Sequence, residues 1–235
     1  MKGMGLVQAP DPRRMAFPMR PHLQEVTAGQ AVPDFGVLEH GRITHQGQTG
    51  TCVGNGFLAW ENCYPRGRKF QQGIQTAFRW YDRATILDPW PDNDLDRQAG
   101  TSTQAGAQVA VEWGLGESYV WAITLEDARA AIAAEVSAVC FGTYWYWSMD
   151  DTDSDGILKV DLSSGIAGGH LWCAIGVVEM FGQVYYLCQN SWGEDWGKEG
   201  LFYVHEDDMR KLLYSGGEAV IIVQTKVLPR FNIAA

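Results

Sequence analysis

The sequence contains no long uninterrupted run of apolar residues. None of its hydrophobic stretches approaches the ~20 consecutive apolar residues that a membrane-spanning helix needs. The opening residues, from Met1 to Phe17, also lack the continuous apolar centre of a secretory signal peptide. We therefore expect a cytoplasmic protein without a membrane partner, while export by another route stays open.

The sequence also contains few basic residues relative to acidic ones. Lys and Arg number 18 against 28 Asp and Glu, which gives a formal net charge of −10 and a pI near 4.9. No basic stripe with interleaved aromatic residues is present. Because such a chain repels phosphate groups, we expect no nucleic-acid partner and no binding to anionic membranes.

Cysteine is limited to five residues, an odd number. A small secreted chain stapled by disulfides usually carries an even number, so the count favours a reduced, intracellular protein. Hydrophobic residues make up 46% of the chain, enough to bury a core without a disulfide or a structural metal. Four of the cysteines are most simply core thiols: Cys63, Cys140, Cys173 and Cys188.

One acidic stretch imitates the start of a calcium-binding loop through Asp151, Asp153 and Asp155. The twelfth position of that loop is Leu162, so the bidentate glutamate that such a loop needs is missing. We interpret the stretch as a solvated acidic turn, and we expect neither a metal nor an organic cofactor.

The periodicity of the apolar residues changes near residue 136. Before it, helical spacing predicts helices over 53–63, 72–87, 101–113 and 125–135. After it, stretches rich in β-branched and aromatic residues predict strands over 137–146, 170–178, 184–189, 200–205 and 218–227. The first half is therefore mainly helical and the second half mainly a sheet.

Residues 1–40 carry five prolines and few periodic apolar positions. This composition predicts an extended arm rather than a packed domain. We expect the arm to be anchored on the outside of the globule, on a protein partner or on a second copy. Only 45 residues precede Gln46, which makes a long inhibitory propeptide improbable.

Three short motifs carry chemistry. The first is Gln46-Gly-Gln-Thr-Gly50-Thr-Cys52, which places an amide and a thiol six residues apart at the start of a helix. The second is Gly168-Gly169-His170. The third is Asn190-Ser-Trp192-Gly, followed by Trp196-Gly197. A thiol, an imidazole and an amide therefore follow one another along the chain.

These motifs resemble those of the papain family of cysteine peptidases, over roughly residues 40 to 225. The resemblance implies an α+β fold with two lobes in a domain of residues 41–235. A helical lobe would span about 41–135 and an antiparallel β lobe or barrel about 136–235, with the active site in the cleft between them.

The same resemblance implies a role for each motif residue. Cys52 would be the nucleophile, Gln46 a donor of the oxyanion hole, His170 the proton carrier, and Asn190 the residue that orients the His170 ring. The substrate, an extended peptide or protein segment, would contact Gly50, Gly100, Gly169 and Trp192. Trp192 would also shield the bond between His170 and Asn190 from water.

Taken singly, these residues have simpler interpretations. A lone cysteine before a helix is more often an inert buried thiol, and a histidine opening an apolar run is more often a core residue. In combination they predict a thiolate–imidazolium pair of Cys52 and His170 and peptide hydrolysis by acyl transfer. Two alternatives stay open: a peptide ligase or cell-wall stem-peptide amidase with the same site, and a binding or assembly component that retains the fold.

Overall fold

The computed structural model describes residues 2–8, 15–27, 30–63, 71–90 and 96–223. Its helices are α1 (Met19–Val26), α2 (Cys52–Asn62), α3 (Ile74–Leu87), α4 (Thr103–Glu112), α5 (Leu125–Ala133) and α6 (Glu206–Tyr214). Its strands are β1 (Gly36–Val37), β2 (Ser118–Trp121), β3 (Val139–Tyr146), β4 (Ile166–Met180), β5 (Gln183–Gln189), β6 (Leu201–His205) and β7 (Glu218–Val223). Two short 3-10 turns, Trp147–Met149 and Leu162–Ser164, precede β4.

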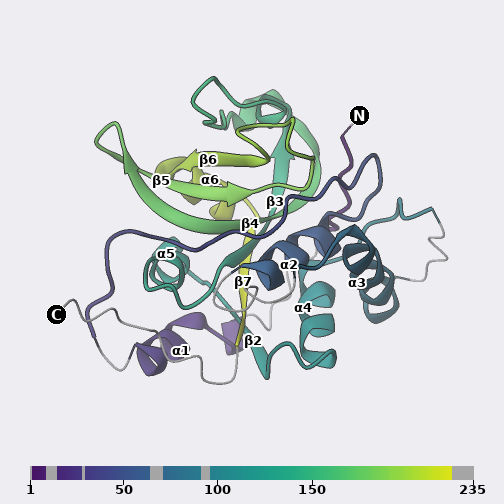
Figure 1. Ribbon diagram of the computed structural model, residues 1–235, viewed down its shortest axis with the longest axis horizontal. Helices are drawn as coiled ribbons and strands as arrows, with labels where there is room; N and C mark the ends of the chain where they lie inside the picture. Colours follow the sequence, from purple (N-terminus) through teal and green to yellow (C-terminus); the bar gives the residue numbers. More distant parts are fainter. Residues whose placement is uncertain (1, 9–14, 28–29, 64–70, 91–95, 224–235) are drawn as a thin grey trace.

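The first lobe is built from α2, α3 and α4 (Figure 1). Helix α2 is buried along nearly its whole length, and Phe57 of α2 stacks on Trp80 of α3 with 5.7 Å between the ring centroids. Ser102 caps α4 by accepting a hydrogen bond from the backbone N–H of Ala105 at 3.1 Å. This packing holds Cys52, the first residue of α2, rigidly at one end of the lobe.

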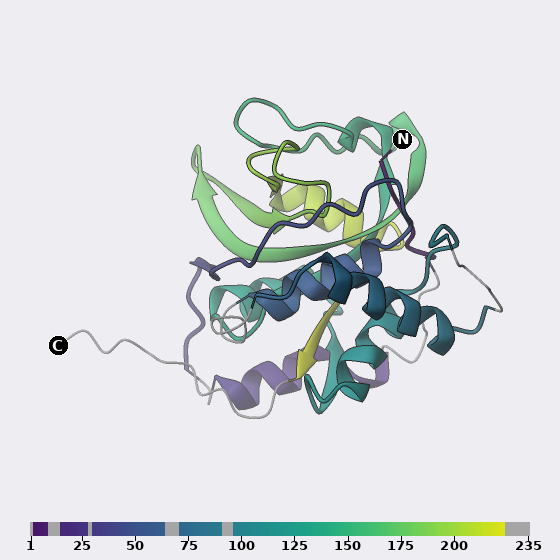
Figure 2. The ribbon, with the colours of Figure 1, turned by 45° about the vertical axis from the view of Figure 1, so that its right-hand side comes forward.

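The second lobe is an antiparallel sheet with strand order β2-β7-β3-β4-β5-β6, and β1 pairs with β4 at its side. The long, curved β4 pairs with β3 on one side and with β5 on the other (Figures 1 and 2). His170 lies on β4 opposite Thr143 of β3. The predicted α+β arrangement, helices first and sheet second, is confirmed.

Some expectations within this fold were wrong. The N-terminal arm is not extended throughout, because α1 forms within it. Met19 and Leu23 of α1 are buried in the core, and Arg20 bonds Asp127 of α5 at 2.8 Å. The short strand β2 and the helix α6 also lie where no element was predicted.

Parts of two predictions lie outside the described residues. These are residues 1, 9–14 and 28–29 of the arm and residues 224–235 of the β lobe, which include the end of the last predicted strand. Over the residues that the structure does describe, no helix is long and apolar enough to cross a membrane.

Candidate active site

Cys52 begins α2 and is completely buried. Its Sγ accepts a hydrogen bond from the backbone N–H of Gly5 at 3.3 Å. The backbone N–H of Leu171 also hydrogen-bonds this sulfur, which favours the thiolate form. Because Leu171 directly follows His170 in β4, the thiol of the helical lobe lies against the strand that carries the histidine.

The His170 ring is fixed by Asn190. The distance between His170 Nε2 and Asn190 Oδ1 is 2.8 Å, and the backbone N–H of Ser191 donates to the same oxygen at 2.8 Å. An oxygen that already accepts one N–H must accept from Nε2 as well, so the proton of neutral His170 sits on Nε2. His170 Nδ1 has no hydrogen-bond partner among the described residues, which leaves it available to take a proton.

Two tryptophans enclose this pair. The Trp192 ring lies 4.9 Å from the His170 ring at an angle of 30°, and Trp145 meets the His170 ring edge-on at 5.0 Å and also contacts Trp192. The predicted shielding role of Trp192 fits this position, whereas the sequence analysis assigned no role to Trp145. The cross-strand pair of Trp145 with Gly168, two residues before His170, places Trp145 here, and no sequence motif marks it.

Gln46 is held by both ends of its amide. Its Nε2 donates to the carbonyl of Thr49 at 2.7 Å, and its Oε1 accepts from the Ser191 hydroxyl at 2.5 Å. The second N–H of Nε2 remains, and this nitrogen lies 3.0 Å from the position that a Cβ on Gly3 would take. The Gln46 amide therefore faces the same stretch of chain that reaches Cys52.

That stretch is residues 2–7, which we name the cleft segment. It runs between the lobes past the start of α2 (Figure 2). Its Gly3 N–H donates to Gly47 at 3.2 Å, and its Gly3 carbonyl accepts from the Trp192 indole at 3.2 Å. Around Gly5 and Leu6 the segment forms a short ladder with both lobes: Thr101 N–H to Gly5 carbonyl at 2.8 Å, Leu6 N–H to Gly169 carbonyl at 3.0 Å, and Val7 N–H to Thr101 carbonyl at 2.9 Å.

The four residues predicted to contact a substrate line this segment. Gly169 accepts from it, and Trp192 donates to it. Gly50 and Gly100 approach Gly5 so closely that a Cβ on Gly5 would overlap the Gly50 carbonyl, and one on Gly100 would overlap the Gly5 carbonyl. The structure thus brings six of the eight predicted site residues against one extended segment of the chain itself, and His170 and Asn190 lie behind Trp192.

Alternation of glycine with larger residues explains the fit of the cleft segment. Gly3 and Gly5 face the backbone of the helical lobe, where a Cβ would overlap the carbonyls of Thr49 and Gly50. Met4 and Leu6 point to the sheet lobe, beside Gly168 and Gly142. The expectation that the arm lies on the outside of the globule is therefore wrong for residues 2–7.

Burial shifts the pKa of both groups toward their neutral forms. It raises the pKa of Cys52 to about 11, against smaller opposing effects of the backbone N–H groups of Leu171 and Gly5. It lowers the pKa of His170 to about 4, although the bond to Asn190 favours the charged ring. With the segment in place the pair is a neutral thiol and a neutral imidazole, not the thiolate–imidazolium pair predicted from the sequence.

Known proteins resemble this chain in sequence and in fold. The sequence model of the papain family cysteine proteases matches residues 102–216, a stretch that contains His170 and Asn190. The chain resembles the papain family over this stretch. No sequence among the curated proteins matches it.

Solved structures of cysteine proteases share the fold of this chain. Xylellain, a cysteine protease from Xylella fastidiosa, superposes with a TM-score of 0.66 at 16% identity, covering 96% of this chain and 97% of the other. Digestive procathepsin L2 from the Tenebrio molitor larval midgut gives 0.62 at 15%, covering 94% and 78%. The ragweed pollen allergen Amb a 11, a cysteine protease in its proform, gives 0.57 at 14%, covering 86% and 68%.

Proposed function

We propose that this protein hydrolyses peptide bonds through a thioester on Cys52. The thiol proton passes to His170 Nδ1 as the sulfur attacks the carbonyl carbon, and Gln46 Nε2 and the Cys52 backbone N–H stabilise the oxyanion. His170 then protonates the leaving amine, and water, deprotonated by His170, releases the acid. The observation that carries the proposal is the His170–Asn190 bond, which leaves Nδ1 without a partner among the described residues, on the strand whose next residue, Leu171, contacts the thiol.

We also propose that the chain is latent as it stands, because the cleft segment occupies the path of the substrate. The segment presents the N–H of Gly5, not a carbonyl carbon, to Cys52 Sγ, so it is held without being positioned for attack. A Cβ on Gly5 would overlap the Gly50 carbonyl, and Gly5→Ala is therefore expected to expel the segment without altering a catalytic residue.

The test of the proposed function is labelling by a peptide that carries a thiol-reactive electrophile. In the Gly5→Ala chain we expect the probe to modify Cys52 alone among the five cysteines, as mapped by mass spectrometry, and we expect unmodified protein to cleave an unstructured protein substrate. Absence of both labelling and cleavage would support the binding or assembly component instead. Products joined to an added amine, in place of hydrolysed products, would identify the ligase.

The division of labour within the site gives a second prediction. His170→Ala in the Gly5→Ala chain should reduce kcat/KM by more than Asn190→Ala does, because His170 carries the proton while Asn190 only orients the ring. We expect a gap of at least about tenfold between the two variants, measured with one fluorogenic peptide. Equal losses in two folded variants would contradict these roles.

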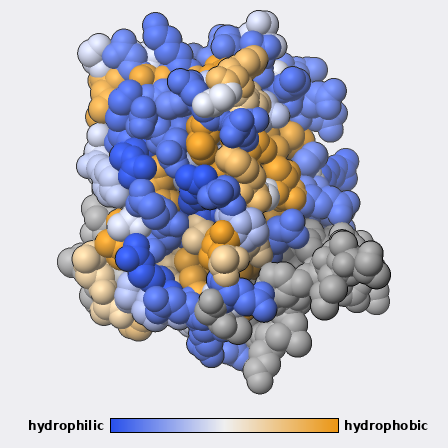
Figure 3. All heavy atoms as spheres, turned by 90° about the vertical axis from the view of Figure 1, so that its left-hand side faces the viewer, coloured by the Kyte–Doolittle hydropathy of each residue, from blue (hydrophilic) through white to orange (hydrophobic). Residues whose placement is uncertain are grey.

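The location and partners of the protein are also proposals. All five cysteines are free thiols, which supports a reducing, cytoplasmic setting. Association through the N-terminal region, with a protein partner or a second copy, is supported by five large apolar side chains that it exposes: Met15, Phe17, Val32, Phe35 and Val37. Figure 3 shows one face of the molecule, on which apolar groups lie among hydrophilic ones.

A further inference from the structure

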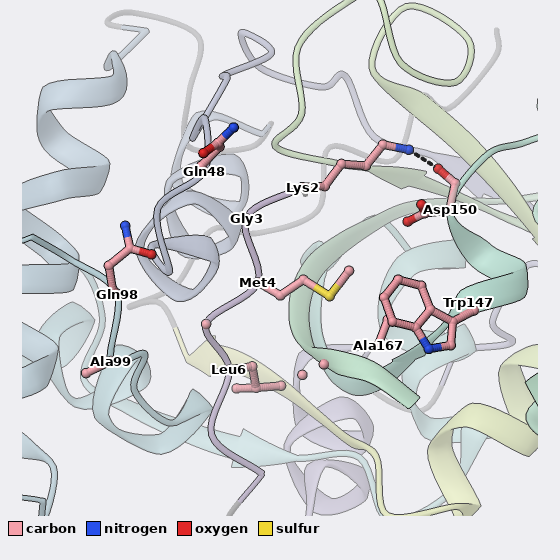
Figure 4. A pocket seen from close by; sticks show the side chains of 13 residues that line it. Lys2, Gly3, Met4, Leu6, Gln48, Gln98, Ala99, Trp147, Asp150 and Ala167 are labelled. Carbon is pink, nitrogen blue, oxygen red and sulfur yellow. Dashed lines mark hydrogen bonds between the residues drawn. The ribbon is translucent and has the colours of Figure 1, made fainter. Parts of the chain in front are cut away.

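Lys2, the first described residue, binds at one end of the cleft in a site that uses three kinds of contact. Its ammonium group lies 5.1 Å from the centre of the Trp192 ring and 5.7 Å from that of Trp196. It donates to the backbone carbonyl of Asp150 and forms an ion pair with the Asp151 carboxylate at 3.1 Å (Figure 4). Two aromatic faces, a carbonyl and a carboxylate together suit a cationic side chain.

The walls of this site are fixed independently of Lys2. The Trp196 indole donates to the Asp150 carbonyl at 2.8 Å, and the Trp192 and Trp196 rings meet edge-to-face at 5.0 Å. Both rings are buried to about 95%, with 5% and 6% of their surfaces exposed. Because these contacts involve no residue of the cleft segment, they remain when the segment leaves, although Trp192 then loses its bond to the Gly3 carbonyl.

The site continues into the substrate cleft. Lys2, Met4, Trp147, Asp150 and Gly168 line a pocket of about 500 Å³ that follows the cleft segment (Figure 4). Lys2 lies three residues from Gly5, which contacts Cys52 Sγ. At about 3.3 Å per extended residue, a cation here is roughly 10 Å along the chain from the reacting sulfur.

The position of His170 shows on which side of the scissile bond the cation site lies. The proton that His170 receives must be passed to the leaving amine, so the leaving group departs past the His170 ring. Trp192 packs on that ring at 4.9 Å and also forms one wall of the cation site. Leu6 and Val7, which pair with Gly169 and Thr101, therefore mark the acyl side, and Lys2 marks the leaving side.

We propose that Trp192, Trp196, Asp150 and Asp151 bind a Lys or Arg side chain of the substrate, two or three residues beyond the scissile bond on the leaving side. In this structure Lys2 of the cleft segment occupies the site. A net charge of −10 further draws basic peptides to the protein. This inference names a substrate class for the proposed peptidase and rests on that function.

The test uses the full chain with Gly5→Ala and Lys2→Gln, so that neither the segment nor its own cation competes. Two peptides differ only in lysine or norleucine at the second or third leaving-side position. We expect kcat/KM to favour the lysine peptide about tenfold, and Asp151→Asn to reduce that preference about threefold. Asp155→Asn, which removes an exposed acid of the same loop without a contact to Lys2, is the matched control.

Equal rates for the two peptides, or equal effects of Asp151→Asn and Asp155→Asn, would overturn the proposal and leave only general attraction between opposite charges. The same peptides are also titrated against the chain that carries Cys52→Ala in addition, where binding needs no catalysis. If the Cys52→Ala chain binds the lysine peptide more tightly, the cation site is supported even when no peptide is cleaved by the active chain. Absence of cleavage would then contradict only the proposed peptidase function. Equal affinities of the two peptides for the Cys52→Ala chain would show that the site binds Lys2 and no substrate cation.

Discussion

Replacing Cys52 with alanine in the Gly5→Ala chain is expected to abolish peptide hydrolysis, with a loss of about 10⁴-fold or more in kcat. The reason is chemical: neither His170 nor Gln46 can form the thioester, and alanine offers no nucleophile. The hydrogen bond that Cys52 Sγ accepts from Gly5 is already lost in this background. Hydrolysis of a fluorogenic peptide at equal protein concentration measures the loss.

A second buried cysteine provides the control for this prediction. Cys188 on β5 is as buried as Cys52, but its thiol only donates weakly to the Tyr186 carbonyl at 3.5 Å. Cys188→Ala should therefore keep hydrolysis within a few-fold of the parent, at a modest cost in thermal stability. Activity retained in a folded Cys52→Ala chain would overturn the assignment of the nucleophile.

The catalytic residues could be predicted from the sequence because their signals are local. Gln46 and Cys52 occupy one turn and the start of one helix, and Asn190 lies two residues from Trp192 in an unusual tryptophan-rich stretch. A hairpin between β4 and β5 then brings Asn190 to His170, as strand pairing of neighbouring strands requires. Motif order and one hairpin were sufficient to predict that contact.

The cleft segment could not be predicted in the same way. Its fit depends on Gly50, Gly100 and Gly169, which become neighbours only in the folded lobes. Its own residues, Lys2 to Val7, show neither helical nor strand periodicity over a useful length. The alternation of Gly3 and Gly5 with Met4 and Leu6 acquires a meaning only once the two walls of the cleft are known.

Two missed helices had different causes. In α1, Pro21 was counted against a helix, but it lies in the first turn, where its missing N–H breaks no intrahelical bond. In α6 the signal was present: three acidic residues open it, which suits the positive end of the helix dipole, and Met209, Leu212 and Leu213 recur at helical spacing and are buried.

Expulsion of the cleft segment is the other large effect expected. Gly5→Ala places a methyl group against the Gly50 carbonyl, and overpacking of this kind costs about 1–3 kcal/mol. Since each 1.4 kcal/mol is a factor of ten, peptide hydrolysis should rise by about tenfold or more over the unchanged chain. Gly73→Ala, just before α3, with open space around its Cβ position and no positive φ, is a control for the loss of a glycine elsewhere.

Alkylation of Cys52 separates expulsion of the segment from other causes of activation. In the unchanged chain the pKa of Cys52 is raised to about 11, so iodoacetamide should modify it slowly at pH 7. Once water and the His170 ring reach the sulfur, that pKa falls, and Gly5→Ala should be modified much faster at the same pH. Equal alkylation rates in the two chains would show that the segment does not control access to the thiol.

Acid should release the same segment, and the sign follows from His170. Burial lowers its pKa from 6.5 to about 4, and we expect departure of the segment to admit water to the ring, so the covered state binds fewer protons than the open state between these values. Lowering the pH through that window therefore favours the open state, and raising it restores the covered one. The measured quantity is the rate at which a peptidyl probe labels Cys52 in the unchanged chain, divided by the rate in the Gly5→Ala chain at the same pH. This ratio should be larger at pH 5 than at pH 7. A ratio that stays constant or falls on acidification would mean that His170 is not uncovered when the segment leaves.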